Sequence, residues 1–460
     1  MGINRSLIEQ ISYASQNSEA IAASHRLTVT TDSRRGEQNS LFVPLVGERF
    51  DGHDHLLSAI DNGAVATLWQ RDKALSKEVP ADFPIFYVED TLQALQELAH
   101  LYRKAIDPTV IAITGSNGKT TTKDMVASTL EATFKLHKTE GNLNNHIGVP
   151  LTLLAMPEDC EVCVLEMGMN HFGEIALLSR IAEPDIGLIT NIGESHIEFL
   201  GSREGIAKAK SEIIEGMSPD GLLIVDGDEP LLDALRHERV NAVLCGYGEA
   251  NDFVISDAKG NQEGSAFKVN GKSYTIPLLG AHNVKNAAYA IAVANHLKLS
   301  GERIFARLKA LKHTAMRLEC VAGKAGTLII NDAYNASPTS MKAAIETIKA
   351  LSDFPNKVIV LGDMYELGPD EEALHREVAS VISAPITHVV TLGERAQWIF
   401  EACQQEQHPS ITLKHFSSKD KVLAYLQTFL SEDTVMLFKA SRLAGLEALV
   451  ERLKNEEDQR

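Results

Sequence analysis

The pattern of hydrophobic residues changes near residue 109, where short mixed segments give way to long apolar ones. Before that point, brief extended runs alternate with turn residues and helical stretches, and they lie at 27–30, 41–43, 65–68 and 85–88. After it, the runs are continuously apolar, at 110–113, 162–165, 186–189 and 222–225. Continuous apolar runs are typical of central strands in a parallel sheet whose two faces are covered by helices. The pattern therefore predicts a small mixed domain followed by a larger one with a mostly parallel sheet.

A third block begins near residue 315 and repeats the alternation of buried strands and helices. Its apolar runs lie at 327–330, 357–361, 388–391 and 435–438. Between the first two blocks, a helical pattern over residues 92–105 leads to Asp107 and Pro108, and the residue before a proline disfavours helix. We predict three α/β domains, with bounds 1–98, 99–314 and 315–460.

Length and charge agree with this division and exclude some functions. At roughly 150 residues per domain, a chain of 460 residues is expected to form about three domains. The net charge of −18 argues against nucleic acid as a partner, because phosphate backbones are bound by basic surfaces. No apolar run reaches the roughly 20 residues that cross a bilayer, and the first residues lack the apolar core of a signal peptide. We expect a cytoplasmic protein without a membrane partner.

The five cysteines are too few and too scattered for a disulfide framework. Cys160 and Cys163 match the C-x-x-C spacing, but they have no second pair and they lead into the apolar run at 162–165. We interpret them as packing residues rather than as a redox or zinc site.

The sharpest motif is a glycine-rich turn between a buried strand and a helix. Gly115 and Gly118 allow backbone N–H groups to face a phosphate, and the N-terminus of the following helix favours negative charge. Lys119 is placed to meet the β- and γ-phosphates, and the Thr120 hydroxyl is placed to meet a magnesium ion. The strict phosphate-loop pattern has four residues between its glycines and this loop has two, so it is a shortened form. The predicted nucleotide-binding residues are Gly115, Ser116, Asn117, Gly118, Lys119, Thr120 and Thr121.

Ionisable side chains follow two of the other predicted central strands. Glu166 comes directly after the run at 162–165, and His196 follows the run at 186–189. Because the carboxyl ends of parallel strands meet at one edge of a sheet, both residues are expected near the phosphate loop. A carboxylate at the end of an apolar strand needs a cationic partner, and Mg²⁺ prefers oxygen ligands.

Several motifs, in the same order, resemble those of the Mur ligases. The resemblance covers nearly the whole chain and is carried by residues 114–121, 141–152, 166–168, 191–196, 207–213, 282–288, 332–338, 361–368 and 441–442. Residues 32–34 and 47–53 resemble the uridine-binding domain of the family. Two stretches depart from the family pattern: Ser337 stands where asparagine is usual, and Asp-Gly-Asp-Glu at 226–229 stands where Asn-Ala-Asp-Asp is usual. We assign no catalytic part to that second stretch.

The resemblance implies both an architecture and a reaction. The N-terminal domain would bind a UDP-linked substrate, the central phosphate-loop domain would bind ATP, and the C-terminal domain would be Rossmann-like. The stretches at 334–341 and 361–368 point to an ATP-dependent amide ligase that joins D-alanyl-D-alanine to UDP-N-acetylmuramoyl-tripeptide. The reaction passes through an acyl phosphate and gives the UDP-linked pentapeptide, ADP and phosphate for peptidoglycan synthesis. The implied cofactors are ATP and two Mg²⁺ ions, the partners are these two small molecules, and a monomer is expected.

The resemblance also implies roles for individual residues. Lys119, Glu166, His196 and Lys210 are expected to be catalytic, and Thr120 joins the last three as a magnesium ligand. Lys210 is the expected site of carbamylation, which turns a cation into an anion; composition alone would leave it, like Lys208, on a charged face in solvent. Further expected nucleotide contacts are Asn283 at the adenine, Arg317 at the phosphates and Asp332 at the ribose. The expected substrate contacts are Ser33, Arg34, Asn144, Asn145, Tyr334 and Asn335.

Other functions remain open at this point. Another Mur-type ligase or a folylpolyglutamate synthase would add a single amino acid instead. A phosphate-loop switch or transport ATPase would hydrolyse nucleotide under the control of a protein partner, and it would leave the motifs at 144–145 and 334–335 without a role. A non-catalytic binding module would not need Glu166 beside a phosphate loop.

Overall fold

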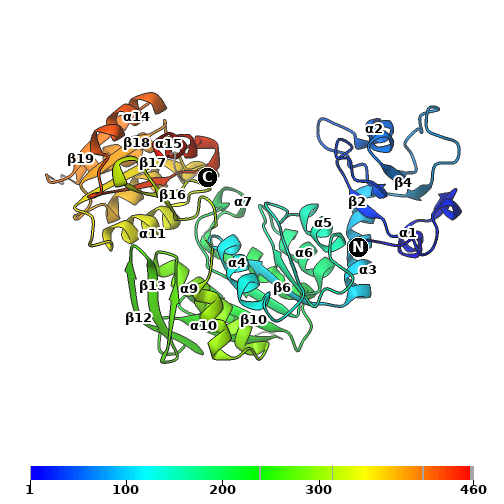
Figure 1. Ribbon diagram of the computed structural model, residues 1–460, viewed down its shortest axis with the longest axis horizontal. Coiled ribbons are helices and arrows are strands. Elements are labelled where there is room, and N and C mark those ends of the chain that lie inside the picture. The colour runs from blue at the N-terminus through cyan, green and yellow to red at the C-terminus, as the bar shows by residue number, and fades with distance from the viewer. Residues whose placement is uncertain (1, 238–239, 313, 407–408, 456–460) are drawn as a thin grey trace.

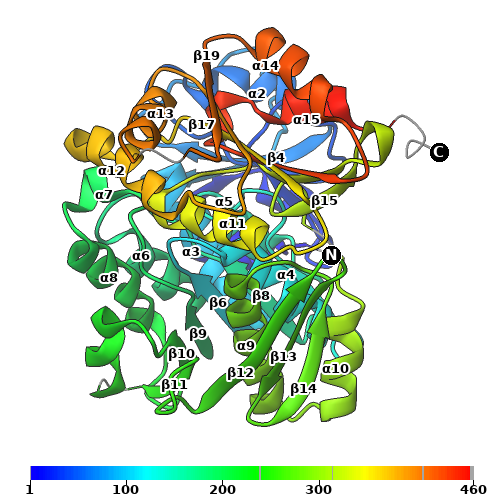
Figure 2. The same ribbon diagram turned by 90° about the vertical axis from the view of Figure 1, so that its left-hand side faces the viewer.

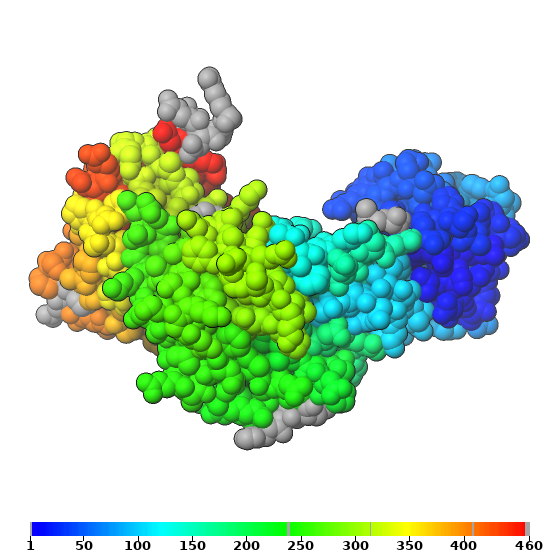
Figure 3. All heavy atoms as spheres, turned by 60° about the horizontal axis from the view of Figure 1, so that its bottom comes forward, coloured from blue at the N-terminus to red at the C-terminus, as the bar shows by residue number. Residues whose placement is uncertain are grey.

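The computed structural model describes residues 2–237, 240–312, 314–406 and 409–455, and it contains three α/β domains, each with its own sheet. The N-terminal and C-terminal domains lie at opposite ends of the long axis, with the middle domain between them (Figure 1). In space-filling view the N-terminal domain, in dark blue, projects to one side of the middle domain (Figure 3). The predicted fold class is confirmed.

The N-terminal sheet has five strands in the order β1-β5-β4-β3-β2 and is parallel except for β1. These strands are β1 (Ala14–Gln16), β2 (Thr28–Thr30), β3 (Ser40–Phe42), β4 (Ala64–Gln70) and β5 (Ile85–Val88). Its helices are α1 (Arg5–Ile11) and α2 (Leu56–Asp61). The extended runs predicted for this region correspond to β2 to β5.

Helix α3 (Thr91–Ile106) joins the N-terminal domain to the middle one. Asp90 caps its first turn, and the helix ends where Asp107 takes a left-handed conformation (φ 51°) before Pro108. Its buried face, with Leu95 and Leu98, belongs to a hydrophobic core that contains residues of both domains. The Tyr102 hydroxyl donates to the carbonyl of Met156, at 2.8 Å, in the middle domain. The expected division between residues 98 and 99 thus falls inside a continuous helix.

The middle sheet has nine strands in the order β14-β13-β12-β11-β10-β9-β6-β8-β7. It is parallel from β7 to β12, and β13 and β14 form an antiparallel extension. The four predicted central runs are β6, β8, β9 and β10. The strands are β6 (Thr109–Thr114), β7 (Leu136–Lys138), β8 (Val162–Glu166), β9 (Ile186–Ile189), β10 (Leu222–Asp226), β11 (Asn241–Gly246), β12 (Phe253–Asn261), β13 (Gly264–Val269) and β14 (Lys272–Ile276).

Helices cover both faces of the middle sheet, as continuous apolar strands require. Val110 and Ala112 of β6 face the core shared with α3, whereas Ile111 and Ile113 face the second core on the other side of the sheet. The helices of this domain are α4 (Lys119–Leu130), α5 (Gly148–Leu154), α6 (Glu174–Ala182), α7 (Ile197–Leu200), α8 (Arg203–Ser211), α9 (Ala281–His296) and α10 (Gly301–Lys309). Of these, α4, α9 and α10 contribute to the second core.

The C-terminal sheet has six strands in the order β15-β16-β20-β17-β18-β19, and it is parallel except for β15. Its strands are β15 (Glu319–Ala322), β16 (Leu328–Asp332), β17 (Asn356–Gly362), β18 (His388–Leu392), β19 (Thr412–Phe416) and β20 (Thr434–Lys439). Its helices are α11 (Pro338–Lys349), α12 (Glu371–Glu377), α13 (Ala396–Gln405), α14 (Lys419–Leu426) and α15 (Glu447–Leu453). This domain stacks on the middle domain, with α11 at the junction (Figure 2).

Two observations concern the cysteine pair and the expected lack of a membrane-spanning segment. Both Cys160 and Cys163 are free and buried, and burial raises the pKa of each thiol. No helix in the described part of the chain has the length and apolar character needed to cross a bilayer.

Candidate active site

The main cavity, of about 440 Å³, lies at the carboxyl ends of the parallel strands of the middle sheet, where the C-terminal domain covers them. Most of the predicted residues line it together, although they come from segments far apart in the sequence. These are Ser116, Asn117, Gly118, Lys119, Thr120, Thr121, Asn144, Asn145, Glu166, His196, Asn283, Arg317, Asp332, Tyr334 and Asn335. The structure therefore brings together, in one cavity, residues that the sequence analysis expected to lie close to one another.

The phosphate loop connects β6 to α4 in a tight turn. Gly115 (φ +145°) and Gly118 (φ +82°) have conformations that favour glycine, and Gly118 precedes α4 without a side-chain cap. The first turn of α4 therefore presents N–H groups that its own helix does not satisfy. Such a helix N-terminus is suited to bind a phosphate.

A second loop, at residues 190–193, holds the phosphate loop in place. The N–H of Ser116 donates to the Asn191 carbonyl at 3.1 Å, and the N–H of Asn117 donates to Asn191 Oδ1 at 3.0 Å. The Thr190 hydroxyl donates to the Asn117 carbonyl at 2.6 Å. The amides of Ser116 and Asn117 thus fix the shape of the loop, and the first turn of α4 supplies further backbone donors for a phosphate.

Gly115 leaves no room for a side chain. A Cβ at this position would lie 1.8 Å from the Thr190 hydroxyl oxygen, so the Gly115→Ala variant must shift the loop or the residue that clamps it. Strain of this kind costs about 1–3 kcal/mol. We expect a lower thermal-unfolding midpoint together with weaker nucleotide binding. Gly301→Ala is the matched control, because a Cβ at the first residue of α10 meets no heavy atom within 4 Å; equal behaviour of the two variants would contradict the prediction.

Lys119 is the cation of the loop. Its ammonium donates to the carbonyl of Gly115 at 2.7 Å. Burial lowers the pKa of Lys119; the charge of Glu166 opposes this shift and that of Arg317 adds to it. A cation that burial disfavours gains strongly from an anion placed next to it, and this is the property required of a phosphate-binding lysine.

Glu166 ends β8 with only 3 % of its surface exposed. Its Oε1 accepts a hydrogen bond from Asn144 Nδ2 at 2.8 Å, but its buried Oε2 has no partner. An orphaned carboxylate oxygen in a cavity is a suitable ligand for a cation. The described residues contain no group of three acidic, histidine or cysteine side chains that could hold a metal alone. Magnesium fits this limited donor set, because it keeps several waters and is commonly bound through one or two carboxylates plus phosphates.

His196 lies just before α7 in a left-handed conformation (φ 66°). Its Nδ1 is 2.9 Å from Oε2 of Glu366, which belongs to the C-terminal domain. The contact with His196 lowers the pKa of Glu366. The sequence did not reveal this pairing, because the two residues are far apart in the chain.

The structure separates the two lysines of α8. Lys210 is 1 % exposed, whereas Lys208 is exposed and its ammonium lies 5.9 Å from the centre of the Phe172 ring. Burial, and then the charge of Lys119, lower the pKa of Lys210 well below its usual value. Composition alone had suggested that both lysines face solvent, and for Lys210 that interpretation is wrong.

The C-terminal domain reaches directly onto the phosphate loop. Arg317 Nη2 donates to the Thr120 hydroxyl at 3.0 Å, and its guanidinium carbon lies 4.3 Å from the centre of the Tyr334 ring. Asp332 Oδ2 accepts from Lys439 Nζ at 2.6 Å, and the same ammonium donates to the Asn335 carbonyl. Lys439 is a buried lining residue that the sequence analysis missed. A lysine that directly follows the apolar run at 435–438 was the available signal.

Helix α9 contributes one face of the cavity through its first turns. Asn283 was predicted there; His282 and Asn286 also line the cavity, although the sequence analysis gave them no role. Asn283 Nδ2 donates to the Leu279 carbonyl at 2.7 Å, and Asn286 Nδ2 donates to Asn283 Oδ1 at 3.1 Å.

Some of the residues predicted to contact substrate form hydrogen bonds or ion pairs within the protein. Asn145 Oδ1 accepts from the N–H groups of Ile147 and Gly148, at the start of α5. Ser33 and Arg34 lie in the N-terminal domain, after β2, and do not line the cavity. Arg34 pairs with Asp32 at 2.8 Å and its side chain is largely exposed.

Comparison with known proteins covers all three domains. The chain matches "Mur ligase family, catalytic domain" over residues 27–103, "Mur ligase middle domain" over 113–294 and "Mur ligase, glutamate ligase domain" over 316–442. It is 47% identical, over 92% of each chain, to the UDP-N-acetylmuramoyl-tripeptide–D-alanyl-D-alanine ligase of Bacillus subtilis.

Comparison with solved structures leads to the same family. A crystal structure of MurF from Acinetobacter baumannii superposes with a TM-score of 0.87 at 31% identity, covering 98% of this chain and 99% of that one. MurF ligase from Thermotoga maritima, in complex with ADP, superposes with a TM-score of 0.83 at 30% identity, covering 94% and 98% of the two chains. On this evidence the chain belongs to the Mur ligase family.

Proposed function

We propose that the chain is the ATP-dependent ligase that joins D-alanyl-D-alanine to UDP-N-acetylmuramoyl-tripeptide in peptidoglycan precursor synthesis. The relatives that match along the whole chain carry the name of this activity. The observation that carries the proposal is a single cavity in which Lys119 lies at a helix N-terminus, Glu166 offers an unpartnered oxygen, and Arg317 arrives from a second domain.

The ligation reaction requires the protein to position the reacting groups and to neutralise the negative charge of the ATP phosphates. A carboxylate is a poor electrophile, and ATP supplies the phosphoryl group that converts it to an acyl phosphate, which the amine of D-alanyl-D-alanine can attack. Lys119 and the first turn of α4 would hold the β- and γ-phosphates and offset their charge. Arg317 would add a second cation from the C-terminal domain, and Asn283 and Asp332 would hold the adenosine.

Two magnesium ions would neutralise the remaining phosphate charge and hold the acceptor carboxylate. Thr120 and Glu166 fit the first ion, because both line the cavity and Glu166 has a free oxygen. His196 and Lys210 would serve the second. A lysine ligand must first become anionic, as it does when its neutral amine adds CO₂ to form a carbamate.

The surroundings of Lys210 support this carbamylation. Its side chain is fully buried, and within the described residues no acidic side chain forms an ion pair with it. Burial and the nearby Lys119 both favour the neutral amine, which is the form that reacts with CO₂. The carbamate would in turn relieve the repulsion between the two lysines, because one of them becomes an anion.

The substrate residues fall on two sides of the middle domain. Ser33 and Arg34, in the N-terminal domain, would contact the uridine diphosphate end, and Asn144 and Asn145 would contact the tripeptide. Tyr334 and Asn335 would form the D-alanyl-D-alanine pocket on the C-terminal domain. This arrangement suits a long substrate whose reacting carboxylate must reach the cavity. We further propose a cytoplasmic monomer that needs no nucleic acid or membrane partner.

The experiment that tests this function is substrate-dependent phosphate release. Purified protein is given ATP, magnesium and UDP-N-acetylmuramoyl-tripeptide, then either D-alanyl-D-alanine or single amino acids. We expect release, with formation of the pentapeptide, only with D-alanyl-D-alanine. Release with a single amino acid instead would favour another Mur-type ligase or a folylpolyglutamate synthase. Release without either acceptor would favour a switch or transport ATPase.

A further inference from the structure

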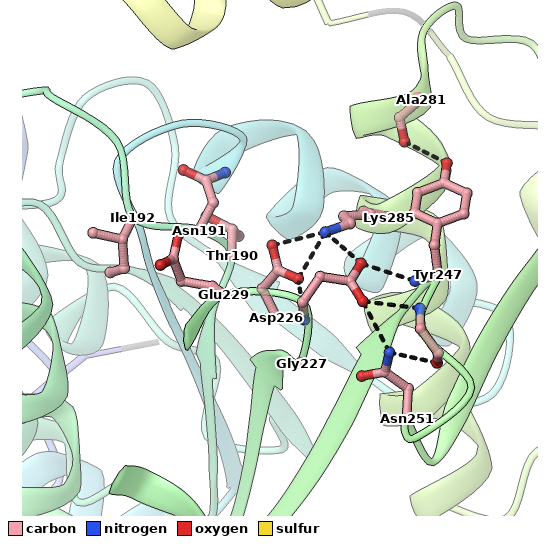
Figure 4. Close-up of polar contacts among 12 residues, drawn as sticks. Thr190, Asn191, Ile192, Asp226, Gly227, Glu229, Tyr247, Asn251, Ala281 and Lys285 are labelled. Atoms are coloured by element: carbon pink, nitrogen blue, oxygen red, sulfur yellow. Dashed lines mark hydrogen bonds and ion pairs between the residues drawn. The ribbon is translucent and has the colours of Figure 1, made fainter. Parts of the chain in front are cut away.

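Helix α9 is tied to the sheet through a cluster of residues that do not line the cavity. Lys285, one turn after the cavity-lining His282, points toward Asp226, the last residue of β10 (Figure 4), and also contacts Asp228, two residues further on. Its ammonium lies 2.7 and 2.9 Å from the two oxygens of Asp226 and 2.9 Å from Asp228 Oδ2. The side chain of Asp226 is 9% exposed and that of Lys285 is 22% exposed, so water screens this ion pair only weakly.

The loop after β11 holds the second carboxylate rigidly. Asp228 accepts from the N–H groups of Tyr247 and Gly248 at 2.8 and 3.0 Å, and from Asn251 Nδ2 at 3.0 Å. A Cβ on Gly246 would lie 2.4 Å from Asp228 Oδ1, and a Cβ on Gly227 would lie 1.8 Å from Asn251 Oδ1. The loop is therefore closely packed around Asp228, and this packing fixes the carboxylate that Lys285 contacts.

Tyr247 makes a second connection to the same helix. Its hydroxyl donates to the carbonyl of Ala281, the first residue of α9, at 3.3 Å. The ammonium of Lys285 lies 5.9 Å from the centre of its ring. Helix α9 is thus bound at its first residue by Tyr247, which follows β11, and one turn later by Asp226, at the carboxyl end of β10 (Figure 4).

The position of this turn matters for the nucleotide site. A Cβ on Gly118 of the phosphate loop would lie 2.9 Å from Asn286 Oδ1, so α9 and the loop are in close contact. The amide groups of Asn283 and Asn286 are hydrogen-bonded to each other and to Leu279, and they move with the helix. A displacement of the turn would therefore move every group that α9 presents to the cavity.

We propose that Lys285, Asp226, Asp228 and Tyr247 are positioning residues that set the affinity for the nucleotide by fixing the first turn of α9 against the phosphate loop. None of the four lines the cavity, and they act through Asn283, Asn286 and His282. The inference rests on the proposed function only in that the cavity binds ATP. It gives a positioning role to Asp226 and Asp228, which lie in the stretch at 226–229 to which the sequence analysis assigned no catalytic part.

The test measures the affinity for ADP by titration calorimetry, with KM and kcat for ATP as a second readout. Tyr247→Phe keeps the ion pairs and removes one hydrogen bond, so we expect ADP affinity to fall about two- to tenfold. Lys285→Met should weaken it by about tenfold or more, and Lys285→Arg should restore part of the loss. KM for ATP should rise and kcat should change little, because the lost interaction stabilises the bound ground state and the transition state equally.

Two matched controls separate positioning from stability. Tyr13→Phe and Lys272→Met change exposed side chains away from the cluster and should leave the ADP affinity unchanged. If Lys285→Met does not fold, Tyr247→Phe decides the question alone. A lower unfolding midpoint with unchanged ADP affinity in folded Tyr247→Phe would overturn the proposal. Because ADP binding needs neither substrate, this result is distinct from a failure of the peptide-ligation assay.

Discussion

Replacing Lys119 with alanine is expected to reduce phosphate release by at least about a thousandfold, because the transferred phosphoryl group loses the cation that the loop directs to it. The ammonium lies at the N-terminus of α4, where it lines the cavity and donates to the Gly115 carbonyl. Arg317 remains, but it comes from another domain and already donates to Thr120.

The fold should survive this change, and that makes the result interpretable. Burial disfavours the Lys119 cation, so the variant without nucleotide should unfold at the same temperature as the parent or slightly higher. Addition of ATP and magnesium should raise the unfolding temperature of the parent and hardly change that of the variant, since only a bound ligand stabilises the native state. Lys272→Ala, an exposed lysine of β14, is the control. Undiminished turnover in Lys119→Ala would refute the proposed phosphate site.

Replacing Lys210 with alanine is expected to abolish ligation almost completely, for a different reason. The variant loses an anionic metal ligand if the lysine is carbamylated, and a short carboxylate such as acetate or formate can then occupy the space and recover part of the activity. A lysine that acted as a cation would not be replaced by an anion. Partial rescue by carboxylate, but not by short amines, is therefore the expected pattern.

Lys208→Ala is the matched control, because it lies on the same helix but its side chain is exposed over the Phe172 ring. It should retain nearly full activity. Carbamylation itself is measured without turnover, by nuclear magnetic resonance of protein equilibrated with ¹³C-labelled bicarbonate; the signal should be present in the parent and in Lys208→Ala, and absent in Lys210→Ala. Full activity of Lys210→Ala would exclude any role of this lysine in the reaction.

The sequence predicted those features that depend on short stretches of chain. The apolar runs at 110–113 and 162–165 became β6 and β8, because a strand buried on both faces must be apolar at every position. Glu166 could be placed in the site for the same reason: the strand that carries it ends where the phosphate loop begins. Motif order then identified the family, which no single strand or loop could have done.

Features that depend on contacts between distant segments were not predictable in this way. The Asn191 clamp on the phosphate loop, the His196–Glu366 pair and the Lys439–Asp332 pair each join segments whose relation is set only by the packed domains. The burial of Lys210 was equally hidden, since only two residues along α8 separate it from the exposed Lys208.

Helix α3 restricts the movement of the N-terminal domain but not that of the C-terminal domain. Because Leu95 and Leu98 lie in a core that the first two domains share, the N-terminal domain cannot rotate on the middle domain without exposing that core to water. Among the described residues, the two cores of the C-terminal domain share only Leu279 with the middle domain, and residues 310–312 and 314–318, between α10 and β15, form no helix or strand. Any opening of the enzyme to admit nucleotide or release product should therefore move the C-terminal domain, while the proposed uridine site on the N-terminal domain keeps its position relative to the middle domain.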